Sequence, residues 1–86
     1  MKDKCILVTG SSSGIGNAIT TRLLDLGAKV VGVARDHKKS IIKNDNYIKY
    51  TFDISDLKNI EKNIKLILND HLEINGLVSN AGYGEF

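Results

Sequence analysis

Short apolar runs and longer amphipathic segments alternate along this chain of 86 residues. The run at 29–34 is too apolar to alternate with polar residues, which is typical of a strand covered on both faces. Apolar runs predict strands at Lys4–Val8, Lys29–Ala34, about Tyr47–Phe52 and about Gly76–Asn80. Apolar residues at helical spacing predict helices over about Ile15–Leu26 and from after Ser55 to about Asp70.

Each predicted helix carries an apolar face and a recognisable end. Gly27 is the predicted C-cap of the first helix, and Ser55 is the predicted N-cap of the second. The segment 37–46 between the second and third strands is polar and holds only a short helix or turn. The first face consists of Ile15, Ala18, Ile19, Leu23 and Leu26, and the second of Leu57, Ile60, Ile64, Ile67 and Leu68.

This alternation of strands and helices predicts a parallel sheet with crossover helices. Right-handed crossovers and a doubly wound start place the four strands in the order 3-2-1-4. A ligand crevice is then expected where the order reverses, at the carboxyl ends of strands one and four. Gly10 leaves one of those ends and the segment Asn80-Ala81-Gly82 leaves the other. The fold class is therefore α/β, and residues 1–86 form one unit without a second domain.

A glycine turn joins the first strand to the first helix. Gly10 is expected to make the sharp exit from the strand, Gly14 to let phosphates come close, and Gly16 to let helix and strand pack tightly. The helix beyond offers unpaired N–H groups and a partial positive charge to an anion. The turn is not a P-loop, because Asn17 stands where a lysine would have to follow the last glycine. The spacing predicts a phosphate cradle.

The turn resembles that of the short-chain dehydrogenase/reductase family, which reads T-G-x-x-x-G-I-G. Thr9, Gly10, Gly14, Ile15 and Gly16 match all of its fixed positions. The resemblance extends over essentially the whole chain but covers only the family's first third. It implies a Rossmann-type sheet, here a partial doubly wound fold, and a nicotinamide dinucleotide as cofactor.

A second family motif follows the fourth predicted strand. Ser79-Asn80-Ala81-Gly82 resembles the family's N-N-A-G, with serine in place of the first asparagine. The resemblance implies that this loop stabilises the central sheet and borders the adenosine ribose and the nicotinamide side. Read without the resemblance, the segment is a polar turn after a strand.

Asp53 and Ile54 close the third predicted strand. In the family an aspartate here accepts a hydrogen bond from the adenine amino group, and the next residue flanks the ring. The resemblance carries these roles to Asp53 and Ile54. The alternative for Asp53 is an acid at the N-terminus of a helix, a role that Asp56 could also fill.

Arg35 follows the second predicted strand and bears on the choice of dinucleotide. A site that prefers NAD has an acid at the end of this strand, and Ala34 stands there instead. A guanidinium suits a 2′-phosphate, so the family pattern implies NADP, with NAD the less favoured cofactor. Ser11 could add a hydroxyl donor to that phosphate. Against this reading, Asp36 could pair with Arg35, and Ser13 stands where some members that prefer NADP carry a basic residue.

The composition and net charge of the chain limit the kinds of molecule that it is expected to bind. The net charge of +2 is too small to indicate a nucleic acid, and no apolar run approaches a membrane span. A single cysteine, Cys5, excludes an internal disulfide and is expected to be a buried apolar residue. We expect a cytoplasmic protein that self-associates through the side of its fourth strand, or, alternatively, one that resides in a larger assembly that supplies further strands there. The predicted cofactor-binding residues are Gly10, Ser11, Ser13, Gly14, Ile15, Gly16, Arg35, Asp53, Ile54, Asn80, Ala81 and Gly82.

The family's catalytic pair, Tyr-x-x-x-Lys, is absent from these residues. Thr51 lies four residues after Tyr47, and Ile54 lies four residues after Tyr50. We therefore interpret the chain as the N-terminal NADP(H)-binding part of an oxidoreductase that acts on a small carbonyl or alcohol. The alternatives are a dinucleotide-binding module without chemistry and an interaction protein whose glycine turn holds nothing.

Overall fold

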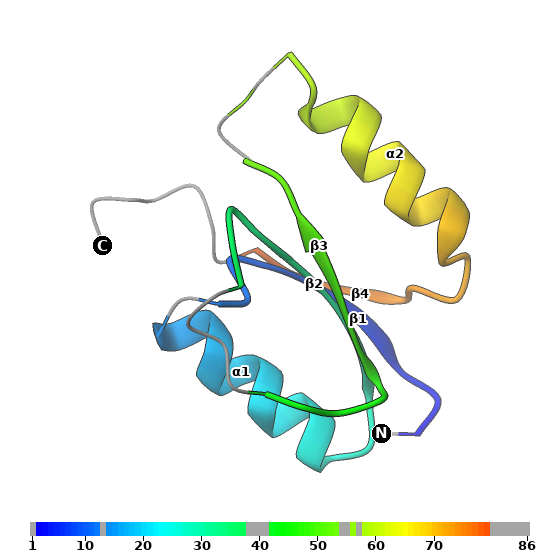
Figure 1. Cartoon of the computed structure of the whole chain (residues 1–86). Helices are drawn as coiled ribbons and strands as arrows, with labels where there is room; N and C mark the ends of the chain where they lie inside the picture. Colours follow the sequence, from blue (N-terminus) through cyan, green and yellow to red (C-terminus); the bar gives the residue numbers. More distant parts are fainter. Residues whose placement is uncertain (1, 13, 38–41, 54–55, 57, 80–86) are drawn as a thin grey trace.

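A computed structural model of the chain describes residues 2–12, 14–37, 42–53, 56 and 58–79. Strands and helices alternate in it, as the sequence pattern predicts (Figure 1). The elements are β1 (Cys5–Thr9), α1 (Gly14–Asp25), β2 (Lys29–Ala34), β3 (Tyr47–Thr51), α2 (Ile60–Asp70) and β4 (Gly76–Ser79). The four strands and α1 lie within about one residue of their predicted bounds, whereas α2 begins later than predicted.

The strands form one parallel sheet in the order β3-β2-β1-β4, which confirms the predicted topology. Thr9 at the end of β1 lies beside Val33 of β2 on one side and Ser79 of β4 on the other. Because all four strands run in the same direction, their carboxyl ends share one edge of the sheet. The order reverses there between β1 and β4, which is where ligands bind in open α/β sheets.

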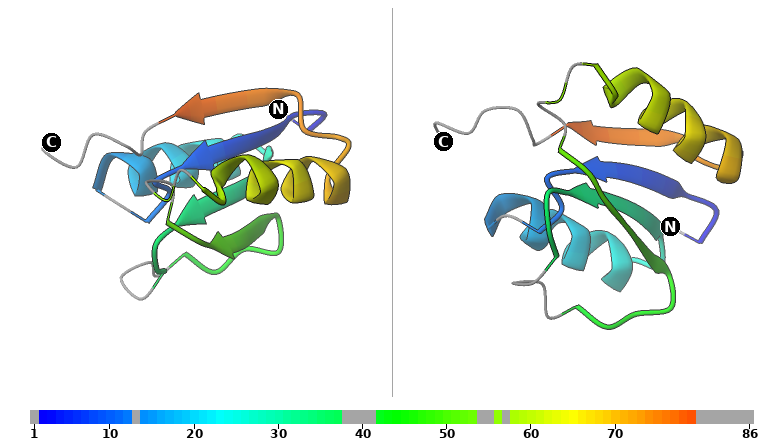
Figure 2. Two further views of the ribbon diagram at one scale, coloured as in Figure 1. Left: turned by 90° about the horizontal axis from the view of Figure 1, so that it is seen from above. Right: turned by 45° about the horizontal axis from the view of Figure 1, so that its top comes forward.

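The two helices cover opposite faces of this sheet (Figure 2). Successive residues of β1 and β2 point to opposite faces, so both strands are buried on both sides and read as continuous apolar runs. Cys5 is buried as predicted, and this burial raises the pKa of its thiol. The cluster under α2 contains Cys5, Leu7, Val31, Val33 and Ile67, and the cluster under α1 contains Ile6, Val8, Leu24, Val30 and Tyr47.

The face of α1 that packs on the sheet differs from its most apolar face. The buried residues are Gly16, Thr20 and Leu24, at a spacing of four, whereas Ile15 is 66% exposed and Leu26 is 42% exposed. Small residues let the helix axis come close to the strands, and a threonine at the contact is invisible to a pattern of apolar positions. The predicted burial face is therefore wrong for most of its residues.

The structure can be compared with the predicted C-cap of α1 and the predicted N-cap of α2. Gly27 has φ of 89°, and the N–H groups of Gly27 and Ala28 donate to the carbonyls of Leu24 and Leu23. This is a Schellman motif, so the predicted C-cap of α1 is confirmed. The N-cap of α2 is Asn59, which corrects the prediction of Ser55, a residue outside those described.

The late start of α2 has a local cause in the turn before it. The Asp56 carbonyl accepts the N–H groups of Asn59 and Ile60, and the Asn59 amide donates to the Asp56 carboxylate at 2.9 Å. The backbone bond of Asn59 has the three-residue spacing of a 3₁₀ turn, which is common at the start of an α-helix, so the regular helix begins only at Ile60. Ile67 is fully buried, Ile60 and Ile64 are half-buried and Leu68 is 41% exposed. Neither helix of the described chain is long and apolar enough to cross a membrane.

Polar contacts hold the opposite edge of the sheet, where the strands begin. The Cys5 N–H donates to the Asn75 side-chain oxygen at 3.1 Å, and the Asn75 N–H donates to the Cys5 carbonyl at 2.9 Å. Lys29 Nζ donates to Glu73 Oε2 at 2.7 Å, and this bond lowers the pKa of Glu73 to about 2. The pair is largely exposed and contributes little stability, but with Asn75 it ties the segment before β4 to β1 and β2.

Candidate functional site

The turn between β1 and α1 is sharply folded and tied to the neighbouring strand. Gly10 has φ of 70°, in the left-handed region that glycine enters without a steric cost. The backbone N–H groups of Gly10 and Ser11 donate to the Val33 carbonyl at 2.7 and 3.2 Å. Gly10 thus makes an abrupt exit from β1, and the turn is anchored to the end of β2.

Gly14, the first residue of α1, has no need to be glycine in the described fold. Its φ is not among the positive values. Apart from its chain neighbours and its own helix backbone, no atom among the described residues lies within 4 Å of where a Cβ would be. Neither backbone strain nor packing therefore demands glycine there. The open space beside Gly14 is what a ligand approaching the backbone would occupy.

The N-terminus of α1 is electrostatically suited to an anion. The first N–H groups of a helix have no partner within the helix, and they carry a partial positive charge. The first turn of α1 contains no acidic residue, so no carboxylate within that turn competes for this end of the helix. Gly16 is buried within the same turn, which brings the helix N-terminus close to the sheet. The arrangement can hold a phosphate or pyrophosphate.

The exits of β2 and β3 lie along the same edge as the turn. Arg35 is exposed and follows Ala34, only two residues after Val33, the acceptor of the turn N–H groups. The Phe52 N–H donates to the Ala34 carbonyl at 3.0 Å, so Asp53 leaves β3 close to this point. Asp53 is also exposed. The fold therefore brings the predicted turn, guanidinium and carboxylate to one edge of the sheet.

Comparison with known proteins shows which family shares this sequence and fold. Residues 4–86 match the short chain dehydrogenase family. The chain belongs to this family. It is 35% identical over 86 residues to benzil reductase ((S)-benzoin forming) of Bacillus cereus, an overlap of 90% of this chain and 34% of that protein. It is 39% identical over 82 residues to sorbitol-6-phosphate 2-dehydrogenase of Klebsiella pneumoniae, an overlap of 95% of this chain and 31% of that protein.

A solved member of the short-chain dehydrogenase family has the same arrangement of elements. The crystal structure of a short chain dehydrogenase from Leptospira borgpetersenii with bound NAD+ matches with a TM-score of 0.81 at 28% identity, over 95% of this chain and 32% of that one. The chain thus spans about a third of the length of the relatives that it matches. The Rossmann-type fold and the kinship with oxidoreductases are established by these matches.

Several of the family residues predicted from the sequence fall outside the described structure. Ile15 and Gly16 lie in the first turn of α1, with Ile15 exposed and Gly16 buried. The chain is described up to Ser79, beside Thr9, which brings the start of the second family motif to the turn. The residues outside the description are Ser13, Ile54, Asn80, Ala81 and Gly82.

The side chain of Ser11 lies beneath the turn. It is fully buried, and its Oγ accepts a hydrogen bond of 2.9 Å from the Tyr47 hydroxyl. The sequence suggests this hydroxyl as a donor to a 2′-phosphate, but in the structure it is buried and bound to Tyr47. Tyr47 and Gly32 were missed because they lie far from the turn in sequence. The sequence feature that could have pointed to this contact is Gly32, a glycine within the valine-rich run 30–33.

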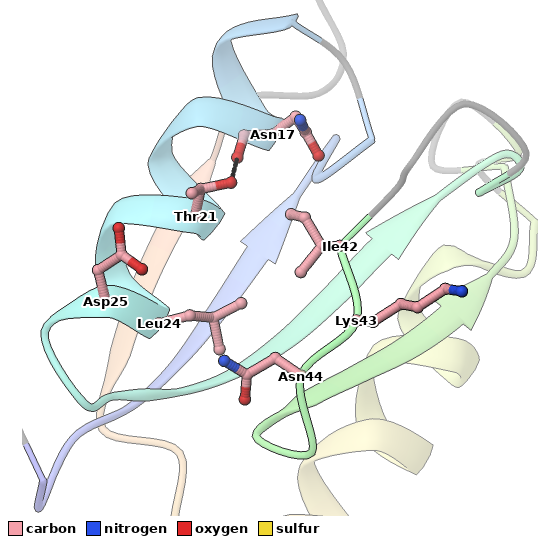
Figure 3. Close-up of a pocket in the computed structure, with 7 residues that line it drawn as sticks. All are labelled: Asn17, Thr21, Leu24, Asp25, Ile42, Lys43 and Asn44. Carbon is pink, nitrogen blue, oxygen red and sulfur yellow. Dashed lines mark hydrogen bonds between the residues drawn. The ribbon is translucent and has the colours of Figure 1, made fainter.

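A separate hollow of about 320 Å³ lies between α1 and the segment that leads into β3 (Figure 3). One of its polar groups is already used, since Thr21 Oγ1 donates to the Asn17 carbonyl at 2.9 Å. None of the residues that line the hollow is among those predicted from the sequence to bind the cofactor. The hollow is lined by Asn17, Thr21, Leu24, Asp25, Ile42, Lys43 and Asn44.

Proposed function

We propose that this chain is the NADP(H)-binding, N-terminal part of a short-chain oxidoreductase. The observation that carries the proposal is the space beside Gly14, at the N-terminus of a helix whose first turn has no acid. Such a cradle favours the pyrophosphate of a dinucleotide. The structural relative that contains NAD+ and the relatives named as reductases and dehydrogenases support the same class.

The preference for NADP rests on the end of β2. Ala34 has no group that could accept the ribose hydroxyls of NAD, and Arg35 presents an exposed guanidinium beside the turn. A guanidinium binds a phosphate through charge-assisted hydrogen bonds. We assign Arg35 to the 2′-phosphate and Asp53, with Ile54, to the adenine. We assign Asn80, Ala81 and Gly82 to the loop that borders the ribose and nicotinamide.

The bound nicotinamide would supply the hydride chemistry, exchanging a hydride with a small carbonyl or alcohol. These residues have a narrower task. Gly10 and Ser11 hold the turn against β2, Gly14 leaves room for the phosphates, and the N-terminus of α1 opposes their charge. Neither Tyr47 nor Tyr50 is followed by a lysine four residues later. The fourth position after Tyr83 lies beyond residue 86. We therefore assign to these residues the orientation of a cofactor, and we assign the proton donor to none of them.

We expect the purified chain to bind NADPH weakly and to show no turnover of any alcohol or ketone. Binding is weak because most of the assigned residues surround only the adenosine and pyrophosphate half of the cofactor. Fluorescence titration with NADPH and NADH, followed by a carbonyl-reduction assay, measures both properties. A chain that binds no nucleotide would favour an interaction protein. Reproducible turnover would show that the chemistry resides in residues not assigned here.

We also propose that the chain self-associates through β4. Among the described strands β4 lies at an edge of the sheet, and Leu77 on it is 65% exposed. An unpaired edge next to apolar surface is a template for pairing with another chain. We expect sedimentation to show dimers or larger species, and Leu77→Lys to shift them toward monomer. Leu26→Lys, on α1 and 42% exposed, is the control and should still associate. A monomer at high concentration before any substitution would contradict the proposal.

A further inference from the structure

A buried hydrogen bond joins the cofactor turn to a strand that is far away in the sequence. The Tyr47 hydroxyl donates to Ser11 Oγ at 2.9 Å, across a separation of 36 residues. Ser11 is fully buried and Tyr47 is 7% exposed. Tyr47 begins β3 beside Val30, so its side chain reaches past the next positions of β2 to meet the turn. A bond shielded from water in this way holds its partners in one geometry.

Gly32 provides the passage for this contact. A Cβ built on Gly32 would lie 2.5 Å from Ser11 Oγ and 2.6 Å from Tyr47 Cε1. Real Cβ atoms do not approach other atoms so closely, and both neighbours are buried. Gly32 in the middle of β2 thus allows a residue of the turn and a residue of β3 to meet over it. This gives a physical reason for glycine within an otherwise valine-rich strand.

The ring of Tyr47 is itself held in place by its neighbours. The Lys49 ammonium lies 5.5 Å from its centroid, and the His37 ring packs edge-on with centroids 6.3 Å apart. His37 is fixed in turn, because its Nε2 lies 2.9 Å from the Tyr50 carbonyl. The tyrosine hydroxyl is therefore aimed at Ser11 by packing on the ring.

We propose that Tyr47 is a positioning residue for the cofactor turn. The turn is attached to the sheet through its N–H groups, which bind the Val33 carbonyl, and also through the Ser11 side chain, which binds Tyr47. The second attachment sets how the turn lies against the N-terminus of α1, and so how well the two together fit a pyrophosphate. This inference rests on the proposed dinucleotide function, since the position of the turn matters only if the turn binds the phosphates of a dinucleotide.

The test compares Tyr47→Phe with the unaltered chain, using two probes. NADPH carries a pyrophosphate that the turn would contact, whereas adenosine 2′-monophosphate carries the adenine and the 2′-phosphate but no pyrophosphate. Losing one buried hydrogen bond should weaken NADPH binding roughly 3- to 10-fold. Affinity for the monophosphate should stay the same. Equal losses for both probes, or no loss for either, would overturn the inference.

Tyr50→Phe is the matched control. Tyr50 lies on the same strand, but its hydroxyl contacts His71 Nε2 at 2.9 Å and not the turn. It should leave NADPH affinity unchanged, and a loss equal to that of Tyr47→Phe would count against a specific role for Tyr47.

A double variant guards against simple misfolding. Ser11→Ala with Tyr47→Phe removes both partners of this bond, so neither hydroxyl is left buried without the other, and the fold is expected to be retained. It should bind NADPH as weakly as the single variant, and wild-type affinity would overturn the inference. An unaltered chain that binds no dinucleotide would instead overturn the proposed function and this inference with it.

Discussion

Replacing Gly14 by alanine is expected to weaken NADPH binding roughly 10- to 100-fold without lowering the stability of the fold. No described atom beyond its neighbours and its own helix comes within 4 Å of the added methyl group, so the free protein accommodates it. A bound pyrophosphate at this position would not, and would lose one or more charge-assisted hydrogen bonds of about 1.5–3 kcal/mol each. Titration with NADPH and thermal unfolding of the same samples measure the two effects.

Gly27→Ala is the opposite control for this experiment. Gly27 has φ of 89°, and an alanine in the left-handed region destabilises a protein by about 1 kcal/mol or more. The substitution should lower the unfolding temperature without changing dinucleotide affinity beyond the loss of folded protein. If Gly14→Ala lowered stability as much and left binding intact, Gly14 would be a structural glycine and the cradle would hold no phosphate.

Replacing Arg35 by aspartate is expected to erase or reverse a preference for NADPH over NADH. A charge-assisted contact with the 2′-phosphate is worth about 1.5–3 kcal/mol when well ordered. Arg35 is exposed, and solvent screening reduces this to roughly 1–2 kcal/mol, or about 5- to 30-fold in affinity. The introduced carboxylate would repel that phosphate and accept hydrogen bonds from the ribose hydroxyls of NADH. Parallel titrations with both dinucleotides measure the ratio.

Arg22→Asp controls for the change in net charge. The chain has two arginines, and Arg22 lies in the last turn of α1, away from the turn that precedes the helix. This variant carries the same charge as Arg35→Asp but should retain the preference for NADPH. Equal affinities for the two dinucleotides before any substitution, or tighter binding of NADH, would contradict the assignment of NADP.

The order of the strands and the glycine turn could both be predicted from the sequence. Valine-rich and isoleucine-rich runs separated by helical segments have few ways to bury themselves, and right-handed crossovers leave the order β3-β2-β1-β4. Gly10 could be predicted as well, because a φ of 70° at the exit of a strand depends on backbone sterics within a few residues. Local rules of this kind need no knowledge of distant contacts.

The burial of α1 and the start of α2 could not be predicted in this way. Thr20 is fully buried while Ile15 is 66% exposed, because close approach of helix and sheet favours small residues over the most apolar ones. α2 begins only after Asn59, because the carbonyl and the carboxylate of Asp56 both bind Asn59 in a tighter turn before the helix. The burial of α1 and the start of α2 both depend on which residues pack or hydrogen-bond nearby. The helix propensity of each residue by itself does not decide them.

By itself, then, the sequence determined the family, the topology and the edge of the sheet where a ligand would bind, because periodicity, crossover handedness and glycine spacing are properties of short segments. Only the tertiary structure decided that Ser11 turns inward to meet Tyr47 over Gly32. Those three residues belong to different elements and come together once the strands have paired. Their contact is set by the register of β1, β2 and β3, and register over such distances is a result of folding the whole sheet.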